Sequence, residues 1–152
     1  MNQNNQLNLP SERIIELKDL QDLANEYADT LNQGDVIALC GEIGAGKTTF
    51  LRCLLQTLGM TVADGFCSPT FTILNQYDLP HHHINHLDLY RLNSFDDLVH
   101  LDLIGCFENH DNLTFVEWGN RFAALHPYYT KEIYFDFILG QSELRCLKFI
   151  SP

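Results

Sequence analysis

Residues 41–48 have the types and spacing of a phosphate-binding loop. They read Gly-Glu-Ile-Gly-Ala-Gly-Lys-Thr and fit the pattern G-x-x-x-x-G-K-[ST] at every fixed position. Successive backbone N–H groups of such a loop form a nest for an anion, and Lys47 is expected to reach the β- and γ-phosphates of a nucleotide. The Thr48 hydroxyl is expected to ligate Mg²⁺. The loop therefore predicts a site for ATP and Mg²⁺.

The segments on either side of the loop have the order that this motif requires. Residues 36–40 form a short apolar run that predicts a buried strand, and residues 49–58 predict a helix ended by Gly59. Strand, glycine loop and helix together favour a nucleotide site over a glycine-rich turn without a ligand. The residues of this region expected to contact the nucleotide are Gly41, Glu42, Ile43, Gly44, Ala45, Gly46, Lys47, Thr48 and Thr49.

Two carboxylates are candidates for the acidic partner that such a site needs. Glu117 follows the apolar run 113–116, and the end of such a strand normally faces the ligand crevice of an open α/β sheet. Asp88 lies in the predicted strand 84–89. Lys47, Asp88 and Glu117 are therefore the expected catalytic residues, with Thr48, Asp88 and Glu117 around Mg²⁺. Which carboxylate contacts the metal directly stays open. The alternative is a solvated strand-end carboxylate for Glu117 and a half-exposed strand residue for Asp88.

Three further patterns are weaker. In Ser68-Pro69-Thr70-Phe71, hydroxyls flank a rigid proline, so Thr70 could sense the γ-phosphate as switch segments do; a capped turn is the alternative. The histidines at 81–83, with His86 nearby, could bind a transition metal, but chance histidines in a surface loop explain them more simply. Trp118 is expected to be a core or interface aromatic.

The rest of the chain predicts an α/β fold. We expect an edge strand at 13–17, a helix from Leu20 to Leu31 capped by Asp19, and a hairpin of strands 70–79 and 84–89 joined by a loop. A helix capped by Ser94, a short helix at 120–125 stopped by Pro127, and a hairpin of 133–138 and 144–149 follow. The expected fold is P-loop NTPase-like, with a central mixed β-sheet flanked by helices in one small domain over residues 11–152, after a flexible tail at 1–10.

Composition limits the possible functions. Nine Lys and Arg against twenty Asp and Glu give the chain of 152 residues a net charge of −11, which opposes direct binding of a nucleic-acid backbone. This charge suits either docking on a basic protein or simple solubility. No apolar stretch reaches membrane-span length, and the start lacks the pattern of a secretory signal. The five cysteines are expected to be free thiols in a reducing cytosol, so a cytoplasmic location is expected.

Four motifs in this order and spacing resemble the TsaE (YjeE) family. They are Gly-Glu-Ile-Gly-Ala-Gly-Lys-Thr-Thr at 41–49, Ser-Pro-Thr-Phe at 68–71, His-Leu-Asp-Leu-Tyr-Arg at 86–91 and Glu-Trp at 117–118. The first motif is shared by all phosphate-loop proteins, whereas the combination of the other three is specific to this family. The resemblance runs from about Leu20 to Arg121.

The resemblance implies a small bacterial ATPase needed to make N6-threonylcarbamoyladenosine in tRNA. Such proteins bind the TsaB–TsaD heterodimer, and their ATP hydrolysis is thought to reset that complex between turnovers, so tRNA is met only indirectly. The resemblance assigns Asp88 and Glu117 to Mg²⁺ and water activation and Thr70 to a switch-like segment. Departures at Glu42, at residues 93–112 and at Arg121 concern the surface that faces the partner more than the nucleotide site.

The free chain is expected to be a monomer and to hydrolyse ATP slowly by itself. It has no obvious arginine finger unless Arg91 serves, so a partner must complete the site. Two rival hypotheses remain. A small-molecule kinase would need a second substrate site, and a non-catalytic nucleotide-dependent binding module would keep its function with Asp88 and Glu117 neutralised.

Overall fold

A computed structural model describes residues 9–151 of the chain. The tail expected at residues 1–10 therefore falls mostly outside the described part. Within that part, Leu9 is half-buried and packs against the hydrophobic core.

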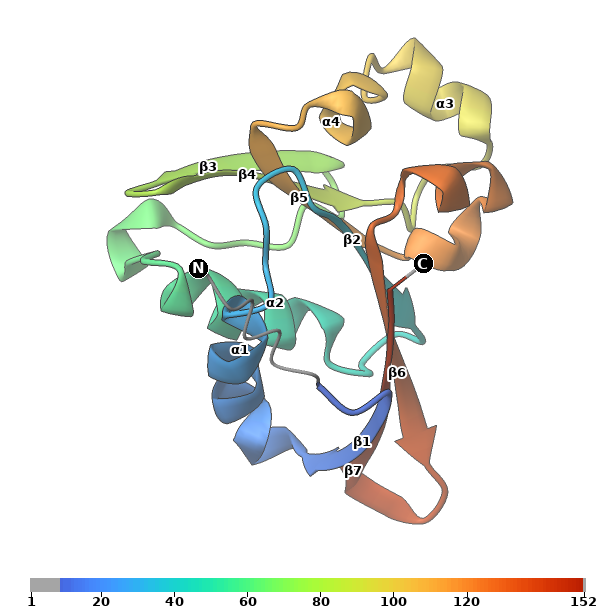
Figure 1. The fold of residues 1–152 in the computed structure, drawn as a ribbon. Coiled ribbons are helices and arrows are strands. Elements are labelled where there is room, and N and C mark those ends of the chain that lie inside the picture. Colours follow the sequence, from blue (N-terminus) through green and yellow to red (C-terminus); the bar gives the residue numbers. More distant parts are fainter. Residues whose placement is uncertain (1–8, 152) are drawn as a thin grey trace, which may run out of the picture.

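The centre of the molecule is a seven-stranded mixed sheet (Figure 1). The strands lie in the order β1-β7-β6-β2-β5-β4-β3. The central strand β2 pairs in parallel with β5 and β6, and β4 pairs in parallel with β5. The predicted edge strand and both predicted hairpins, β3–β4 and β6–β7, are confirmed. The strands are β1 (Glu12–Glu16), β2 (Val36–Gly41), β3 (Leu74–Leu79), β4 (His82–Asp88), β5 (Asn112–Glu117), β6 (Lys131–Ile138) and β7 (Gln141–Ile150).

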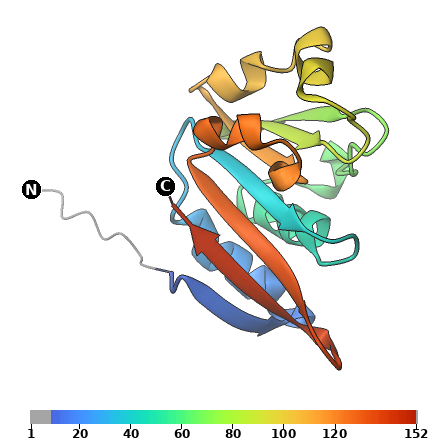
Figure 2. The same cartoon turned by 90° about the vertical axis from the view of Figure 1, so that its right-hand side faces the viewer.

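Helices cover both faces of this sheet (Figures 1 and 2). One hydrophobic cluster joins the sheet to α1 and α2, and a second joins its other face to α3, α4 and the segment after β5. The mixed sheet flanked by helices confirms the expected fold class. The helices are α1 (Leu20–Ala28), α2 (Lys47–Thr57), α3 (Phe95–His100) and α4 (Gly105–Glu108).

Burial on both faces explains the uninterrupted apolar sequence of β2. Successive side chains of a strand point to opposite faces. Ile37 and Leu39 accordingly lie in the cluster with α1 and α2, whereas Ala38 and Cys40 lie in the other. All five cysteines of the chain are free, and burial raises the pKa of the Cys40 thiol to about 12. This strand gives the phosphate-binding loop that follows it a rigid support.

The strand expected at 70–79 begins only at Leu74, because residues 70–73 form a turn. Ile73 has a φ of 69° and its N–H donates to the Pro69 carbonyl at 2.6 Å. A positive φ is unusual for a β-branched residue. The loop expected at 80–83 is also shorter than predicted, since β4 already begins at His82.

Three predictions about helix ends were wrong. The helix expected to run from Leu20 to Leu31 already ends at Ala28. Asp19 stands before α1, but its side chain makes no capping hydrogen bond, because a 3-10 turn at Leu17–Asp19 leads directly into the helix. The helix expected at 120–125 is two 3-10 segments, and Pro127 lies inside the second rather than ending it. The predicted helix after Ser94 is confirmed, and the short α4 was not predicted.

Within the described residues, no helix is both long and apolar enough to cross a membrane.

Candidate functional site

The strand order brings the two candidate carboxylates together at one edge of the sheet. Asp88 ends β4 and Glu117 ends β5, and the two residues are register partners. Glu117 is also the register partner of Leu39 in β2, just before the phosphate-binding loop. The carboxyl ends of parallel strands form the ligand crevice in such sheets. The loop and both carboxylates therefore meet where a ligand is expected.

Gly41 and Gly46 occupy positions in the loop where a residue with a side chain would be strained. Gly41 has a φ of 146°, and a Cβ there would lie 2.5 Å from the carbonyl oxygen of Phe135 in β6. Gly46, with a φ of 110°, stands immediately before the first residue of α2. Backbone angles of this kind strongly favour glycine. The loop consequently turns tightly from β2 into the helix and presents the N-terminus of α2 to the crevice.

Lys47 is a buried cation whose hydrogen bonds go to carbonyl groups. Its Nζ donates to the carbonyls of Gly41 at 2.6 Å and Glu42 at 2.8 Å, and it lies 4.2 Å from the ring centroid of Trp118. Burial lowers the pKa of Lys47 below its ordinary value, and the nearby charges of Glu117 and Asp88 oppose that shift. The positive charge therefore lies at the floor of the crevice without a direct carboxylate partner among the described residues.

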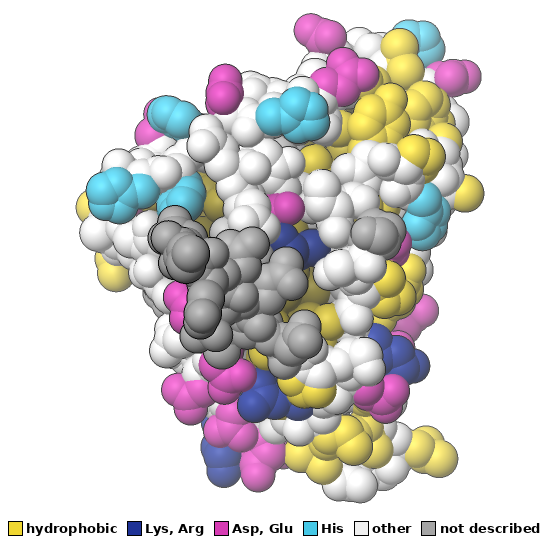
Figure 3. All heavy atoms as spheres, in the orientation of Figure 1, with side chains coloured by type: hydrophobic (Ala, Val, Ile, Leu, Met, Phe, Trp, Pro, Cys, Tyr) yellow, Lys and Arg dark blue, Asp and Glu magenta, His cyan; other side chains and the backbone are white. Residues whose placement is uncertain are grey.

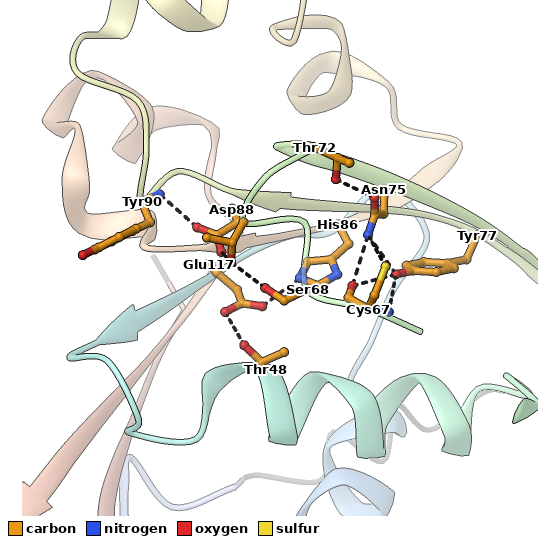
Figure 4. A network of polar contacts seen from close by, with 11 residues as sticks. Thr48, Cys67, Ser68, Thr72, Asn75, Tyr77, His86, Asp88, Tyr90 and Glu117 are labelled. Atoms are coloured by element: carbon orange, nitrogen blue, oxygen red, sulfur yellow. Dashed lines mark hydrogen bonds and ion pairs between the residues drawn. The ribbon is translucent and has the colours of Figure 1, made fainter. Parts of the chain in front are cut away.

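Glu117 links the phosphate-binding loop to a buried histidine (Figure 4). Its Oε2 accepts a hydrogen bond from the Thr48 hydroxyl at 2.7 Å, and its Oε1 lies 2.8 Å from His86 Nε2. His86 is fully buried on β4, and its Nδ1 has no hydrogen-bond partner within the described chain. Phe66 stacks on the imidazole at 5.7 Å. The carboxylate is thus held on both oxygens, with one directed at the hydroxyl of the loop.

Asp88 connects the crevice to the segment before β3. Its Oδ2 accepts a hydrogen bond from the Thr70 hydroxyl at 2.8 Å, and its Oδ1 accepts one from the Tyr90 N–H at 2.9 Å. The Thr70 hydroxyl also lies 2.8 Å from that of Ser68. The hydroxyls of Ser68 and Thr70, on either side of Pro69, therefore reach the site through the hydrogen bond from Thr70 to Asp88. Figure 4 labels Ser68 and Asp88 at the two ends of this chain of contacts.

These groups surround a cavity of about 230 Å³. It brings together most of the predicted site residues, whereas Gly41, Glu42 and Ala45 belong to the loop but do not line the cavity. Arg91 does not line it either, and its guanidinium lies 4.9 Å from the ring of Phe71. The lining residues are Ile43, Gly44, Gly46, Lys47, Thr48, Thr49, Ser68, Thr70, Asp88, Tyr90, Glu117 and Trp118.

Sequence reasoning did not predict the contributions of three residues. His86 was grouped with the surface histidines, although its position two residues before Asp88 on a strand places both on one face of the sheet. That spacing could have identified it. Trp118 was expected in a core or interface. It does pack against one hydrophobic cluster, and it also lines the cavity with Tyr90, their ring centroids 5.0 Å apart. Tyr90 lies in the 86–91 motif that carries the family resemblance, but no role was predicted for it.

The histidine cluster is divided between different environments. His83 pairs with Asp78 at 2.6 Å, whereas His86 points inward to Glu117. Within residues 9–151, no group of three or more His, Cys, Asp or Glu side chains is arranged to hold a metal ion.

Thr48, Asp88 and Glu117 have the donor chemistry that suits Mg²⁺. A hydroxyl and two carboxylates supply hard oxygen ligands, and protein-bound Mg²⁺ usually takes one or two carboxylates together with substrate phosphates. The Thr48–Glu117 hydrogen bond puts two of these donors side by side next to the phosphate-binding loop. The residues at this edge therefore fit the metal that accompanies a nucleotide.

Comparison with known proteins identifies the family of this chain. The family described as threonylcarbamoyl adenosine biosynthesis protein TsaE matches residues 14–144. A tRNA threonylcarbamoyladenosine biosynthesis protein TsaE of Aquifex aeolicus is 37% identical over 116 residues, covering 76% of this chain and 81% of that protein. The protein of the same name from Rickettsia bellii is 34% identical over 111 residues, covering 72% of this chain and 74% of that protein.

A solved structure has the same fold. The crystal structure of Bacillus subtilis YdiB superimposes with a TM-score of 0.62 at 22% identity, covering 95% of this chain and 88% of that one. With the match over residues 14–144, these similarities establish that the chain belongs to the TsaE family of tRNA threonylcarbamoyladenosine biosynthesis proteins.

Proposed function

We propose that this protein is an ATPase that serves tRNA threonylcarbamoyladenosine formation and acts in complex with a TsaB–TsaD heterodimer. The observation that carries the proposal is the position of Glu117, which accepts a hydrogen bond from Thr48 of the phosphate-binding loop and lies beside Asp88. A loop hydroxyl, two carboxylates and a lysine at one cavity are the parts that phosphoryl transfer to water requires.

Lys47 and the loop would bind the phosphate chain. The Lys47 ammonium is bonded only to carbonyls and would turn one of its donors to the β- and γ-phosphates of ATP. Loop N–H groups and the N-terminus of α2 would stabilise the remaining charge. A phosphate would also supply the negative partner that this buried cation lacks.

The two carboxylates would divide their roles. Thr48 and Glu117 would hold Mg²⁺, because their hydrogen bond puts both oxygens at the loop. The bound ion would neutralise charge that develops on the phosphates. Asp88 would orient the attacking water, since its two oxygens are fixed by Thr70 and by the Tyr90 N–H. Thr70 would couple this position to the switch-like segment.

Turnover by the chain alone is expected to be low. No arginine among the described residues lines the cavity, and an arginine supplied by a partner typically contributes ~10³–10⁵ in rate. The net charge of −11 suits docking on a basic partner surface. We propose a monomeric, cytoplasmic chain with one ATPase domain over residues 11–152. The chain would interact with tRNA only indirectly, as part of the complex with TsaB–TsaD.

ATP hydrolysis by this chain, alone and with TsaB–TsaD, tests the proposal, with Lys47→Ala as the blank. Slow turnover that rises with the heterodimer and disappears in Lys47→Ala is expected. Turnover that the heterodimer does not stimulate would contradict the proposed partner. Transfer of phosphate to a small-molecule acceptor instead of water would favour the kinase hypothesis.

A further inference from the structure

Arg145 is a buried arginine that joins the terminal hairpin to the phosphate-binding loop. It lies on β7 and is only 5% exposed. Its Nε donates to the Ala45 carbonyl at 3.2 Å and its Nη2 to the Gly44 carbonyl at 3.4 Å. These contacts connect residues that are 100 and 101 positions apart in the chain. The loop is therefore anchored from outside the cavity by a strand that has no other role in the site.

The guanidinium has no acidic partner within residues 9–151. Its Nη1 donates to the carbonyls of Ser142 at 2.6 Å and Leu144 at 2.7 Å, and its charged carbon lies 4.4 Å from the ring of Phe137. None of the ion pairs of the described chain includes Arg145. A buried charge that is hydrogen-bonded but has no counter-ion is costly. An anion that binds nearby therefore gains from it.

The bonded carbonyls also determine the direction of loop N–H groups. In a trans peptide the C=O and the following N–H point in opposite directions. Arg145 holds the Gly44 and Ala45 carbonyls on the side of β7 and so turns the N–H groups of Ala45 and Gly46 toward the inside of the loop. The Ala45 N–H there donates to the Glu42 carbonyl at 3.2 Å, which closes the curl of the loop.

We propose that Arg145 is a positioning residue for the phosphate chain of the bound nucleotide. It fixes two peptide planes of the loop and adds positive charge behind the phosphates, in a chain whose net charge is −11. The inference rests on the proposed function, since it assigns a residue that tunes the same site. The family match ends at residue 144, so this assignment comes from the contacts of Arg145 and not from the family.

The test is the affinity of the Arg145→Met variant for two phosphate ligands, MgADP and inorganic tripolyphosphate, each measured by displacement of a fluorescent ADP analogue. A hydrogen bond to a charged group is worth enough that both dissociation constants should rise by about tenfold or more. Similar losses for both ligands are expected, because Arg145 acts on the phosphate chain. Arg145→Lys keeps the charge but not the fork of donors, so its affinity should lie between those of wild type and Arg145→Met.

Two variants separate this effect from lost charge and lost stability. Arg13→Met removes the same charge from the neighbouring strand β1, where Arg13 pairs with Glu26 at 2.6 Å. Leu147→Ala opens a cavity on β7 at a fully buried residue that makes no hydrogen bond to the loop. Leu147→Ala should lower the melting temperature, and both variants should keep their affinities within about twofold of wild type, well below the tenfold loss expected for Arg145→Met.

Unchanged affinity in a folded Arg145→Met, or equal losses in Leu147→Ala, would overturn the inference. If Arg145→Met does not fold, Arg145→Lys decides: weaker binding than wild type supports the inference, and unchanged binding overturns it. A wild-type chain that binds neither ligand would overturn the proposed function, and the inference with it.

Discussion

The two ends of the central strand β2 show how differently the fold treats buried charge. At the amino end, Asp35 is nearly fully buried and forms an ion pair with Lys131. Its carboxylate also accepts hydrogen bonds from the Thr130 hydroxyl and the Asn32 N–H, both at 2.8 Å. This charge is neutralised inside the protein, and each carboxylate oxygen has a partner.

At the carboxyl end, the charges are not neutralised by one another. Asp88 and Glu117 lie side by side, and hydroxyls, one N–H and His86 hold them. Lys47 carries the opposite charge at the same cavity, yet its Nζ is bonded to carbonyls. The amino end is a closed structural pair, whereas the carboxyl end keeps both signs of charge available for a metal and a phosphate chain.

The largest expected effect is the loss of ATP hydrolysis when a carboxylate at the carboxyl end of the sheet is neutralised. Glu117→Gln should lower the rate of ATP hydrolysis by about a hundredfold or more, because an amide is a weaker ligand for Mg²⁺ and the ion contributes several kcal/mol of charge stabilisation in the transition state. The amide can still contact Thr48 and His86, so the free energy of unfolding should change little. Steady-state hydrolysis with TsaB–TsaD and chemical denaturation measure the two quantities. A loss of stability without a loss of rate would assign Glu117 to structure.

The converse variant at the amino end should affect stability alone. Asp35→Asn removes the counter-ion of the partly buried Lys131, and breaking a buried pair of this kind costs about 3–5 kcal/mol. Urea unfolding measures this loss. Nucleotide affinity, measured at a temperature where the variant is folded, should stay at the wild-type value. If affinity falls as well, the two ends are coupled and the contrast is wrong.

A smaller effect is expected at the hydroxyl that orients Asp88. Thr70→Val removes a hydrogen bond that positions Asp88 for the attacking water, so the rate of ATP hydrolysis with TsaB–TsaD should fall by about tenfold. Thr72→Val is the matched control, because the Thr72 hydroxyl bonds only to Asn75 at 2.8 Å (Figure 4). An equal loss of rate in both variants would mean that general softening of the segment, rather than Asp88, is responsible.

The smallest expected effect is on the pH dependence of nucleotide binding. Burial lowers the pKa of Lys47 from its ordinary 10.5, and only the charged form attracts phosphate. Affinity should therefore decline as the pH rises through this lowered pKa, at a lower pH than for a lysine with the ordinary pKa of 10.5. Displacement titrations over the alkaline range measure it, and the decline should be absent from the weak residual binding of Lys47→Ala. A decline of the same size in that variant would assign it to another group.

The local sequence pattern was enough to predict the phosphate-binding loop, the strand that ends at Glu117 and the terminal hairpin. Gly41 to Thr48 could be recognised because the loop imposes its own glycine, lysine and threonine positions. Glu117 could be placed because an apolar run that ends in an acid predicts a strand end at the crevice. The alternation and turns of the terminal hairpin likewise predicted its pairing.

Contacts between distant segments decided the rest. Residues 70–73 have strand-like composition, but Pro69 and the Thr70–Asp88 hydrogen bond hold them in a turn. His86 belongs to the site through its contact with Glu117, and it is buried there beneath Phe66, which comes from an irregular segment and stacks on its ring. Apolar character alone did not determine burial near α3: Val99 on this helix and Leu101 just after it are half-exposed, and hydrophobic side chains gather over this part of the surface (Figure 3).

Ligand-induced thermal stabilisation tests the contrast between the two ends most directly. The melting temperatures of wild type, Asp35→Asn and the double variant Asp88→Asn/Glu117→Gln are measured with and without a non-hydrolysable ATP analogue and Mg²⁺. A ligand that binds the folded state raises the melting temperature according to its affinity. Asp35→Asn should melt lower but gain as much stability as wild type, whereas the double variant should melt no lower and lose the Mg²⁺-dependent gain. A gain lost in Asp35→Asn, or kept in the double variant, would contradict the account.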